Sequence, residues 1–241
     1  MSVVIPIPEV TDEVRVVPEP SPPEPSRTRF EEQLRELLQG MVTMAVTCSE
    51  MLFEATDALK TQNPRAIQDV LEKDDQVDEL ERRIEAEVIR LLALQQPVLG
   101  SDLRFVNLAL KAITDLERIG DHCVNIARVA QQMDREGILY QPLVDIERLQ
   151  RTVAVMLDDT IQALIRRDLT LARQVIAADE EADRLYRRMQ EQLRTKMRTG
   201  DAGMALRGSY LLFVLHYLER IGDHCVGIAE RLPDVARCEV G

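Results

Sequence analysis

The chain has 241 residues, and its 30 basic and 42 acidic side chains give a formal charge of -12 and a pI near 4.8. This balance excludes nucleic acid as an expected partner, because phosphate binding requires a basic surface. Hydrophobic residues at 45% and charged residues at 30% indicate a globular protein of one or two domains. No membrane span is expected, because the longest apolar stretch, Tyr210 to Leu218, is far shorter than the ~18 residues required. Met1 to Pro8 lacks the basic and apolar regions of a signal peptide.

The cysteine and aromatic content narrows the class further. Cys48, Cys123, Cys225 and Cys238 form no CxxC pair, so we expect reduced thiols in a cytoplasmic protein. Aromatic residues make up only 3% of the chain and Trp is absent, which is a thin supply for a β-sandwich or barrel. The composition therefore favours an all-α fold.

Proline positions divide the chain. Seven of the eleven prolines lie in the first 25 residues, together with five acidic side chains and one basic one. Such a segment cannot bury enough apolar surface to fold, so residues 1–27 are predicted to be a disordered tail. A short C-terminal tail is expected at residues 234–241.

The other four prolines are far apart, and the segments between them are rich in helix-forming residues. Each of these prolines is expected at a helix edge. Asn63, Ser101-Asp102, Asp168 and Asp201 are the predicted N-terminal caps, and Gly137 is a predicted helix stop. The predicted helices cover roughly 30–61, 64–95, 102–134, 143–166, 169–198 and 203–231.

The decisive sequence feature is an internal repeat. The segment LERIGDHC at 116–123 recurs unchanged at 218–225, an offset of 102. A second set of matches has an offset of 105, and it pairs Asp74, Asp78, Leu80, Arg82 and Arg83 with Asp179, Asp183, Leu185, Arg187 and Arg188. The difference of three residues falls between the second and third helices of each half. The chain is therefore predicted to be a tandem duplication of three-helix bundles, at 28–136 and 137–233.

Acidic residues interrupt otherwise apolar helix faces at repeated positions. In the third predicted helix, Glu117 and Asp121 continue a stripe of apolar residues at helical spacing. Residues four apart share a helix face, so the two carboxylates are neighbours. The second helix shows the same pattern. The repeated acids are Asp74, Asp78, Glu117 and Asp121, with Asp179, Asp183, Glu219 and Asp223 as their copies.

Clustered carboxylates repel one another and need a counter-charge. A multivalent cation is one solution, and ligation by carboxylates alone favours Mg²⁺, Mn²⁺ or iron, with zinc possible but less suited. The alternative is a set of salt bridges to Arg82, Arg83, Arg118 and their copies. Both interpretations stay open at this point.

Other residues near the acids give weaker signals. His122 and His224 follow Glu117 and Glu219 by five residues, unlike the Glu-x-x-His pattern of di-iron bundles, and they are expected to be exposed, with hydrogen bonding to the ligands as the alternative. Gly120 and Gly222 lie between the acids, either because a neighbour approaches closely or because glycine is merely tolerated there. Cys123 and Cys225 are expected to pack in the core.

The segment DLERIGDHCVNIA at 115–127 resembles the PhoU family of phosphate-uptake regulators, and the resemblance extends from about Phe30 to Leu232. It implies a cytoplasmic, usually dimeric helical protein with multinuclear metal clusters. Such a protein links the ATPase subunit of the Pst phosphate ABC transporter to the PhoR sensor kinase without catalysis, and damps the phosphate-starvation response.

Carried over by position, the family's metal ligands are the eight repeated acids. Gly227 stands where the first half has Asn125, which predicts weaker metal binding in the second half. Three other functions remain as alternatives: a carboxylate-bridged dimetal enzyme, a structural adaptor without metal, and an accessory of a low-affinity phosphate permease. A dimetal enzyme would need a general base or nucleophile beside the acids, and the sequence offers none.

Overall fold

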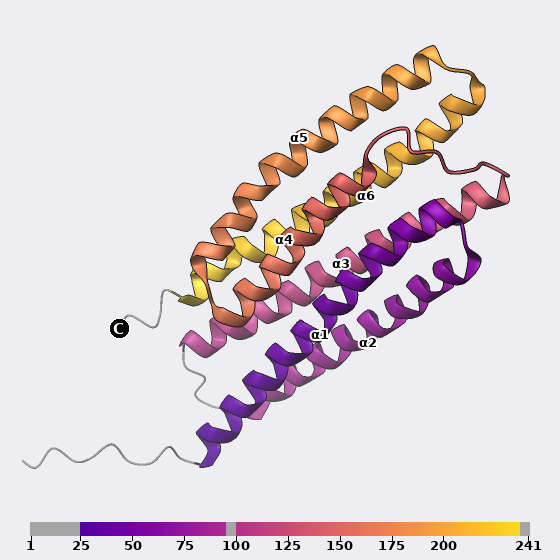
Figure 1. Cartoon of the computed structure of the whole chain (residues 1–241). Helices are drawn as coiled ribbons and strands as arrows, with labels where there is room; N and C mark the ends of the chain where they lie inside the picture. The colour runs from indigo at the N-terminus through magenta and orange to yellow at the C-terminus, as the bar shows by residue number, and fades with distance from the viewer. Residues whose placement is uncertain (1–24, 95–99, 237–241) are drawn as a thin grey trace, which may run out of the picture.

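The computed structural model describes residues 25–94 and 100–236, and these residues form helices joined by short turns and one longer linker (Figure 1). The helices are α1 (Pro25–Thr61), α2 (Pro64–Leu94), α3 (Gly100–Arg135), α4 (Ile146–Arg166), α5 (Leu169–Thr199) and α6 (Ala202–Ala236). Within this part of the chain there is no strand, so the all-α prediction is confirmed. None of these helices has an apolar run long enough to cross a membrane.

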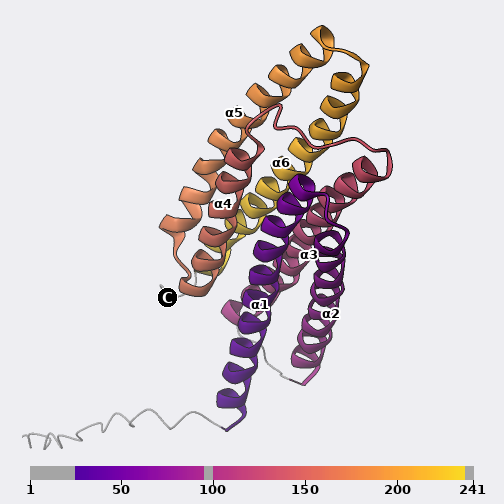
Figure 2. The same cartoon turned by 45° about the vertical axis from the view of Figure 1, so that its right-hand side comes forward.

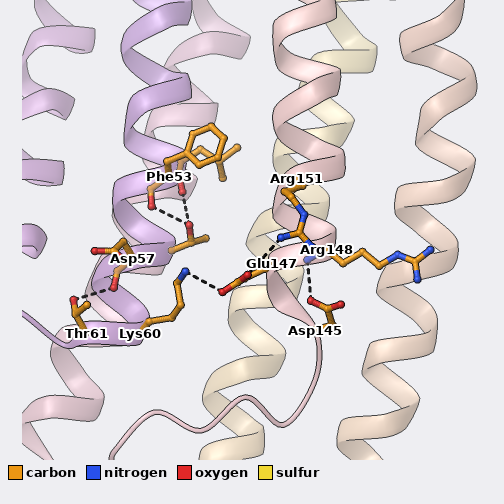
Figure 3. Close-up of polar contacts among 10 residues, drawn as sticks. Phe53, Asp57, Lys60, Thr61, Asp145, Glu147, Arg148 and Arg151 are labelled. Atoms are coloured by element: carbon orange, nitrogen blue, oxygen red, sulfur yellow. Dashed lines mark hydrogen bonds and ion pairs between the residues drawn. The ribbon is translucent and has the colours of Figure 1, made fainter.

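The six helices form two three-helix bundles that lie side by side (Figures 1 and 2). Helix α3 packs against α6 and α1 packs against α4, whereas α2 and α5 lie on the outside. At the α1–α4 contact, Lys60 Nζ lies 3.1 Å from Glu147 Oε1 (Figure 3). The α2–α3 connection and the α5–α6 turn lie at opposite ends of the molecule (Figure 1).

The apolar stripes that the sequence predicts form the core. Leu116, Ile119 and Cys123 of α3 are fully buried, as are their repeat counterparts on α6. The Sγ atom of Cys48 donates a hydrogen bond to the carbonyl oxygen of Leu116, so the first thiol is also used inside the core. Burial raises the pKa of Cys225 to about 12, which keeps this thiol protonated.

The repeat is visible in the helix boundaries. Helices α2 and α5 begin and end at positions that differ by 105. Helix α4 has 21 residues and corresponds to residues 41–61 of α1, which has 37 residues, so α1 has an N-terminal extension of 16 residues at 25–40. In the second half the linker 136–145 takes the place of that extension. The carbonyls of Leu143 and Leu139 accept hydrogen bonds from Lys196 and Arg207, which hold the linker against α5 and α6.

Most predicted caps are confirmed. Asn63 Oδ1 accepts a hydrogen bond from the backbone N–H of Arg65, Asp168 accepts two from the first turn of α5, and Asp201 accepts one from Met204. Gly137 ends α3 with a φ of 67°, and the N–H of Ile138 donates back to the carbonyl of Met133.

Several predicted boundaries are wrong at their edges. Helix α1 begins at Pro25 because the fixed φ of proline suits a first helical position and because Phe30 packs in the core, so residues 25–27 are helical instead of belonging to the tail. Helix α3 begins at Gly100, which places Ser101 and Asp102 in its first turn and not at its cap. Residues 1–24 and 237–241, where the two tails were predicted, lie outside the described residues.

The start of α4 and the end of α6 also differ from the prediction. Helix α4 starts at Ile146, because Asp145 caps it by accepting the N–H of Arg148 (Figure 3). Helix α6 passes through Pro233, which was predicted to mark an edge, and continues to Ala236. Near the end of a helix a proline costs little, because few further turns depend on the lost hydrogen bond. Residues 234–236 are therefore helical.

Replacing Gly137 by Ala should lower the free energy of unfolding by about 1 kcal/mol, because a side chain disfavours the left-handed conformation that ends α3. The matched control is Gly203→Ala in the first turn of α6, where alanine should be neutral or stabilising. Denaturant unfolding followed by circular dichroism measures both. Equal effects of the two substitutions would show that the conformation of Gly137 does not limit stability.

Candidate metal centre

The four acids of the first half come together between two packed helices. Asp74 and Asp78 lie on α2, and Glu117 and Asp121 lie on α3. Burial raises the pKa of Asp74 to about 6, and the negative charges of the other three acids raise it further in the same direction. The pKa of Glu117 is raised as well, first by burial and then by Asp121. The four carboxylates therefore share one half-buried, electrostatically crowded site.

The second half repeats this cluster. Asp179 and Asp183 lie on α5, and Glu219 and Asp223 lie on α6. Burial is the main cause of the raised pKa of Asp179, followed by the charges of Asp223 and Asp183. The pKa of Glu219 is raised by burial and then by Asp223. Each half thus gathers its four predicted acids, whereas their role as metal ligands stays a prediction.

Arginines partly neutralise both clusters. In the first half Arg118 lies 3.3 Å from Glu117 and 3.0 Å from Asp121. In the second half Arg220 Nη1 lies 2.6 Å from Asp223 Oδ2, and Arg187 pairs with Asp183. The salt-bridge interpretation therefore holds for part of each cluster.

Three of the acids are not neutralised in this way. In the described part of the chain, the side chains of Asp74, Asp78 and Asp179 form no ion pair. Arg82, which was a predicted partner of the cluster, pairs instead with Glu79 at 3.1 Å. Each half therefore keeps uncompensated carboxylate charge.

Local geometry tests whether a cation suits these clusters. The Oε2 atom of Glu219 is buried without a hydrogen-bond partner. A Cβ atom at Gly120 would lie 3.2 Å from Asp74 Oδ1, and one at Gly222 would lie 3.8 Å from Asp179 Oδ1. The glycines thus leave space beside a carboxylate, which favours close approach over mere tolerance. Oxygen donors, crowded charge and an unpartnered buried oxygen fit a hard cation.

The side chains are not arranged to hold an ion as they stand. Among residues 25–94 and 100–236, no three His, Cys, Asp or Glu side chains converge tightly enough to coordinate one metal ion. The arginine contacts give the physical reason, since they draw Asp121, Asp183 and Asp223 towards guanidinium groups. A cation would have to compete with these arginines for the same oxygens.

The two histidines occupy a different place from the predicted one. His122 and His224 were expected to be exposed, but they meet between the two bundles, with ring centroids 5.6 Å apart. His122 stacks on Tyr217, and His224 Nδ1 lies 2.9 Å from Asp115 Oδ1. Burial, followed by the charge of His224, lowers the pKa of His122 to about 4. The sequence pattern of one helix could not show this, because the covering side chains come from the other half.

Gly227 belongs to this same interface between the bundles. A Cβ atom there would lie 3.6 Å from Asp115 Oδ2, which pairs with Arg231. Burial opposes ionisation of Asp115, but hydrogen bonds from His224 and Arg231 prevail and lower its pKa. The glycine therefore makes room for an ion pair between the halves. Weaker metal binding in the second half stays a prediction.

Two copies of one acid-bearing three-helix bundle define a duplicated, all-helical protein. The family model described as PhoU domain matches residues 41–130 and 146–232, which begin 105 residues apart. The chain therefore belongs to the PhoU family, as its DLERIGDHCVNIA segment predicts.

Relatives of known name agree with this assignment. The chain is 33% identical over 205 residues to a phosphate-specific transport system accessory protein PhoU homolog of Clostridium acetobutylicum, covering 85% of this chain and 93% of the relative. The homolog of the same name in Deinococcus radiodurans is 34% identical over 206 residues, with coverage of 86% and 95%. The crystal structure of PhoU from Pseudomonas aeruginosa matches with a TM-score of 0.80 and 33% identity over 86% of this chain and 99% of the other.

A second solved structure is similar. The phosphate transport system regulatory protein PhoU from Streptococcus pneumoniae matches with a TM-score of 0.77 and 28% identity, covering 86% of this chain and 96% of the other. The observed arrangement of two tandem bundles therefore agrees with the fold of the family.

Asp74→Asn should stabilise the protein in EDTA at pH 8. The pKa of Asp74 in the folded protein, about 6, exceeds the unfolded value near 3.8, so the metal-free protein loses stability as pH rises through this window. Removing the charge should raise the free energy of unfolding by about 1 kcal/mol, a value discounted for solvent screening.

The gain should fade below about pH 4, where the carboxyl is protonated in both states. Urea unfolding at pH 4 and pH 8 measures it. The exposed neighbour Asp75, replaced by Asn, is the matched control and should change little. A loss of stability at pH 8 for Asp74→Asn alone would contradict the inferred repulsion.

Proposed function

We propose that this protein is a metal-binding regulator of phosphate uptake and of the phosphate-starvation response, acting in the cytoplasm by contact and without catalysis. The observation that carries the proposal is the pair of half-buried four-carboxylate clusters at corresponding positions in the two halves. Its biological setting follows from the names of the relatives, which are accessory or regulatory proteins of phosphate transport systems.

The charged groups beside the acids favour binding over catalysis. A dimetal hydrolase or oxidase needs a general base or nucleophile next to the metal ligands. Here the side chains that contact the acids include Arg118, Arg187 and Arg220, whose guanidinium groups remain protonated in proteins and cannot accept a proton. They can hold carboxylates in place until a cation displaces them.

Bound cations would change the surface that partners meet. Divalent or trivalent ions such as iron, manganese or magnesium, or zinc, would neutralise much of the charge of Asp74, Asp78, Glu117 and Asp121, and the second cluster would respond alike. Interfaces require complementary charge, so this change would alter which partner docks. The proposed partners are the ATPase subunit of a Pst-type phosphate transporter, a PhoR-type sensor kinase and a second copy of the chain.

Replacing Glu117 and Asp121 together by Ala should lower the metal content of the purified protein by about half, because the second cluster remains intact. The matched variant replaces Glu219 and Asp223 and should have the same effect. Elemental analysis after loading with each metal separately, with circular dichroism as a check of folding, measures the outcome. Unchanged metal content in both folded variants would exclude these acids as ligands.

Partner binding should depend on the cations. We expect the affinity for the transporter ATPase subunit and for the kinase, measured by calorimetry, to fall about tenfold in chelator and in the Glu117/Asp121 variant. Binding that is unaffected by chelator would contradict a metal-dependent switch. Phosphatase or oxidase turnover that disappears in the Glu117/Asp121 variant would favour the enzyme alternative instead.

A further inference from the structure

The two halves contain grooves at corresponding positions, and the grooves differ. The groove of the first half has a volume of about 310 Å³ and includes Arg83, Ala86, Glu87 and Arg90 of α2 in its lining. The groove of the second half has about 650 Å³ and is lined by Leu143, Arg188, Glu191, Gln192, Thr195 and Lys196. Four of these residues lie 105 positions after the four on α2, so the grooves are copies of one site.

In the first half a helix closes this site. The extension of α1 at residues 25–40 lies on the groove, and its Phe30 and Leu37 are each only 2% exposed. Gln33 Nε2 donates a hydrogen bond of 3.4 Å to Glu87 Oε1. A Cβ atom at Gly40 would lie 3.2 Å from the side chain of Ile84, so this helix is tightly seated.

In the second half no helix of the described chain covers the site. The linker 136–145 crosses it, with Leu143 at the position that corresponds to Leu38 of α1. The backbone carbonyl of Leu143 accepts a hydrogen bond of 2.5 Å from Lys196 Nζ. The linker therefore fills less space than a helix, which explains why this groove has roughly twice the volume of the other. Leu139 and Leu206 beside the linker are 70% and 43% exposed.

Charge distinguishes the two grooves further. The C-terminal part of α5 exposes Arg188, Arg194 and Arg198, and none of the three forms an ion pair with another described residue. The positions equivalent to Arg194 and Arg198 are Ile89 and Ala93, which carry no charge. This basic ridge stands out in a chain whose formal charge is -12. A bound segment should therefore carry negative charge.

We propose that the groove lined by Leu143 and α5 binds an acidic amphipathic helix of a partner protein, seated as residues 25–40 are seated on α2. Its apolar face would cover the groove and its acidic flank would meet Arg188, Arg194 and Arg198, in the helix-in-groove mode of recognition. The chain's own acidic N-terminal segment is less suited, because α1 begins at the end of the molecule opposite to the α5–α6 turn (Figure 1).

The test uses two fluorescent peptides with the sequence of residues 25–40. One is unmodified, with three Arg and three Glu, and the other carries Arg27→Glu, Arg29→Glu and Arg35→Glu. Fluorescence anisotropy with the full-length protein should show at least about tenfold tighter binding of the acidic peptide.

Variants locate the binding site. Arg188→Glu combined with Arg198→Glu, or Thr195→Trp alone, should weaken binding of the acidic peptide at least tenfold. The matched substitutions in the first half are Arg83→Glu and Arg90→Trp, and they should leave binding unchanged. All of these side chains are exposed, and thermal unfolding by circular dichroism verifies that each variant is folded.

Several results would overturn the proposal. Equal affinity of the two peptides, or equal losses from the first-half and second-half substitutions, would exclude this groove. A tenfold gain in affinity after deletion of residues 1–24 would identify the chain's own tail as the occupant. Loss of a protein dimer in Thr195→Trp, measured by ultracentrifugation, would assign the groove to a second copy. Displacement of the peptide by phosphatidylserine vesicles, with no displacement by phosphatidylcholine, would assign it to a lipid surface.

Discussion

The packing of α3 against α6 is the contact on which the rest of the structure depends. Each of these helices has one apolar seam buried inside its own bundle and a second face that meets the other bundle. The acids alternate with the residues of this interface, since Asp121 precedes His122 and Asp223 precedes His224. The rotation of α3 and α6 about their axes is therefore fixed from two sides, and this fixes the direction in which both acid clusters face.

Duplication has given the two halves the same acids in different surroundings. Across the interface, His224 meets the carboxylate of Asp115, whereas His122 meets the ring of Tyr217, the counterpart of Asp115. One side of the interface is thus ionic and the other aromatic. The clusters differ in the same way, because one arginine serves the first and two arginines serve the second. The second cluster is closer to neutral before any cation binds, and a cation there displaces more existing ion pairs.

The sequence predicted the elements that the repeat and the apolar spacing determine. The boundaries of α2 and α5, the buried seam of α3 and the grouping of acids on neighbouring helices all follow from patterns within one helix or between two copies. The positions of His122, Gly227 and Leu143 depend on which surface covers them, and single-helix periodicity does not contain that information. The early start of α1 was missed because local proline content outweighed the packing of Phe30.

Helix α5 connects the second acid cluster with the basic groove. Asp183 and Arg188 are five residues apart, about 7.5 Å along the helix axis, which is within one Debye length in physiological salt. The negative field of the cluster therefore weakens the attraction of the ridge for an acidic partner. A cation at Asp183 would remove that field, and it would also release Arg187 from its ion pair beside Arg188. Cation binding and the docking of an acidic helix would thus favour each other, because both reduce the charge repulsion that the other meets.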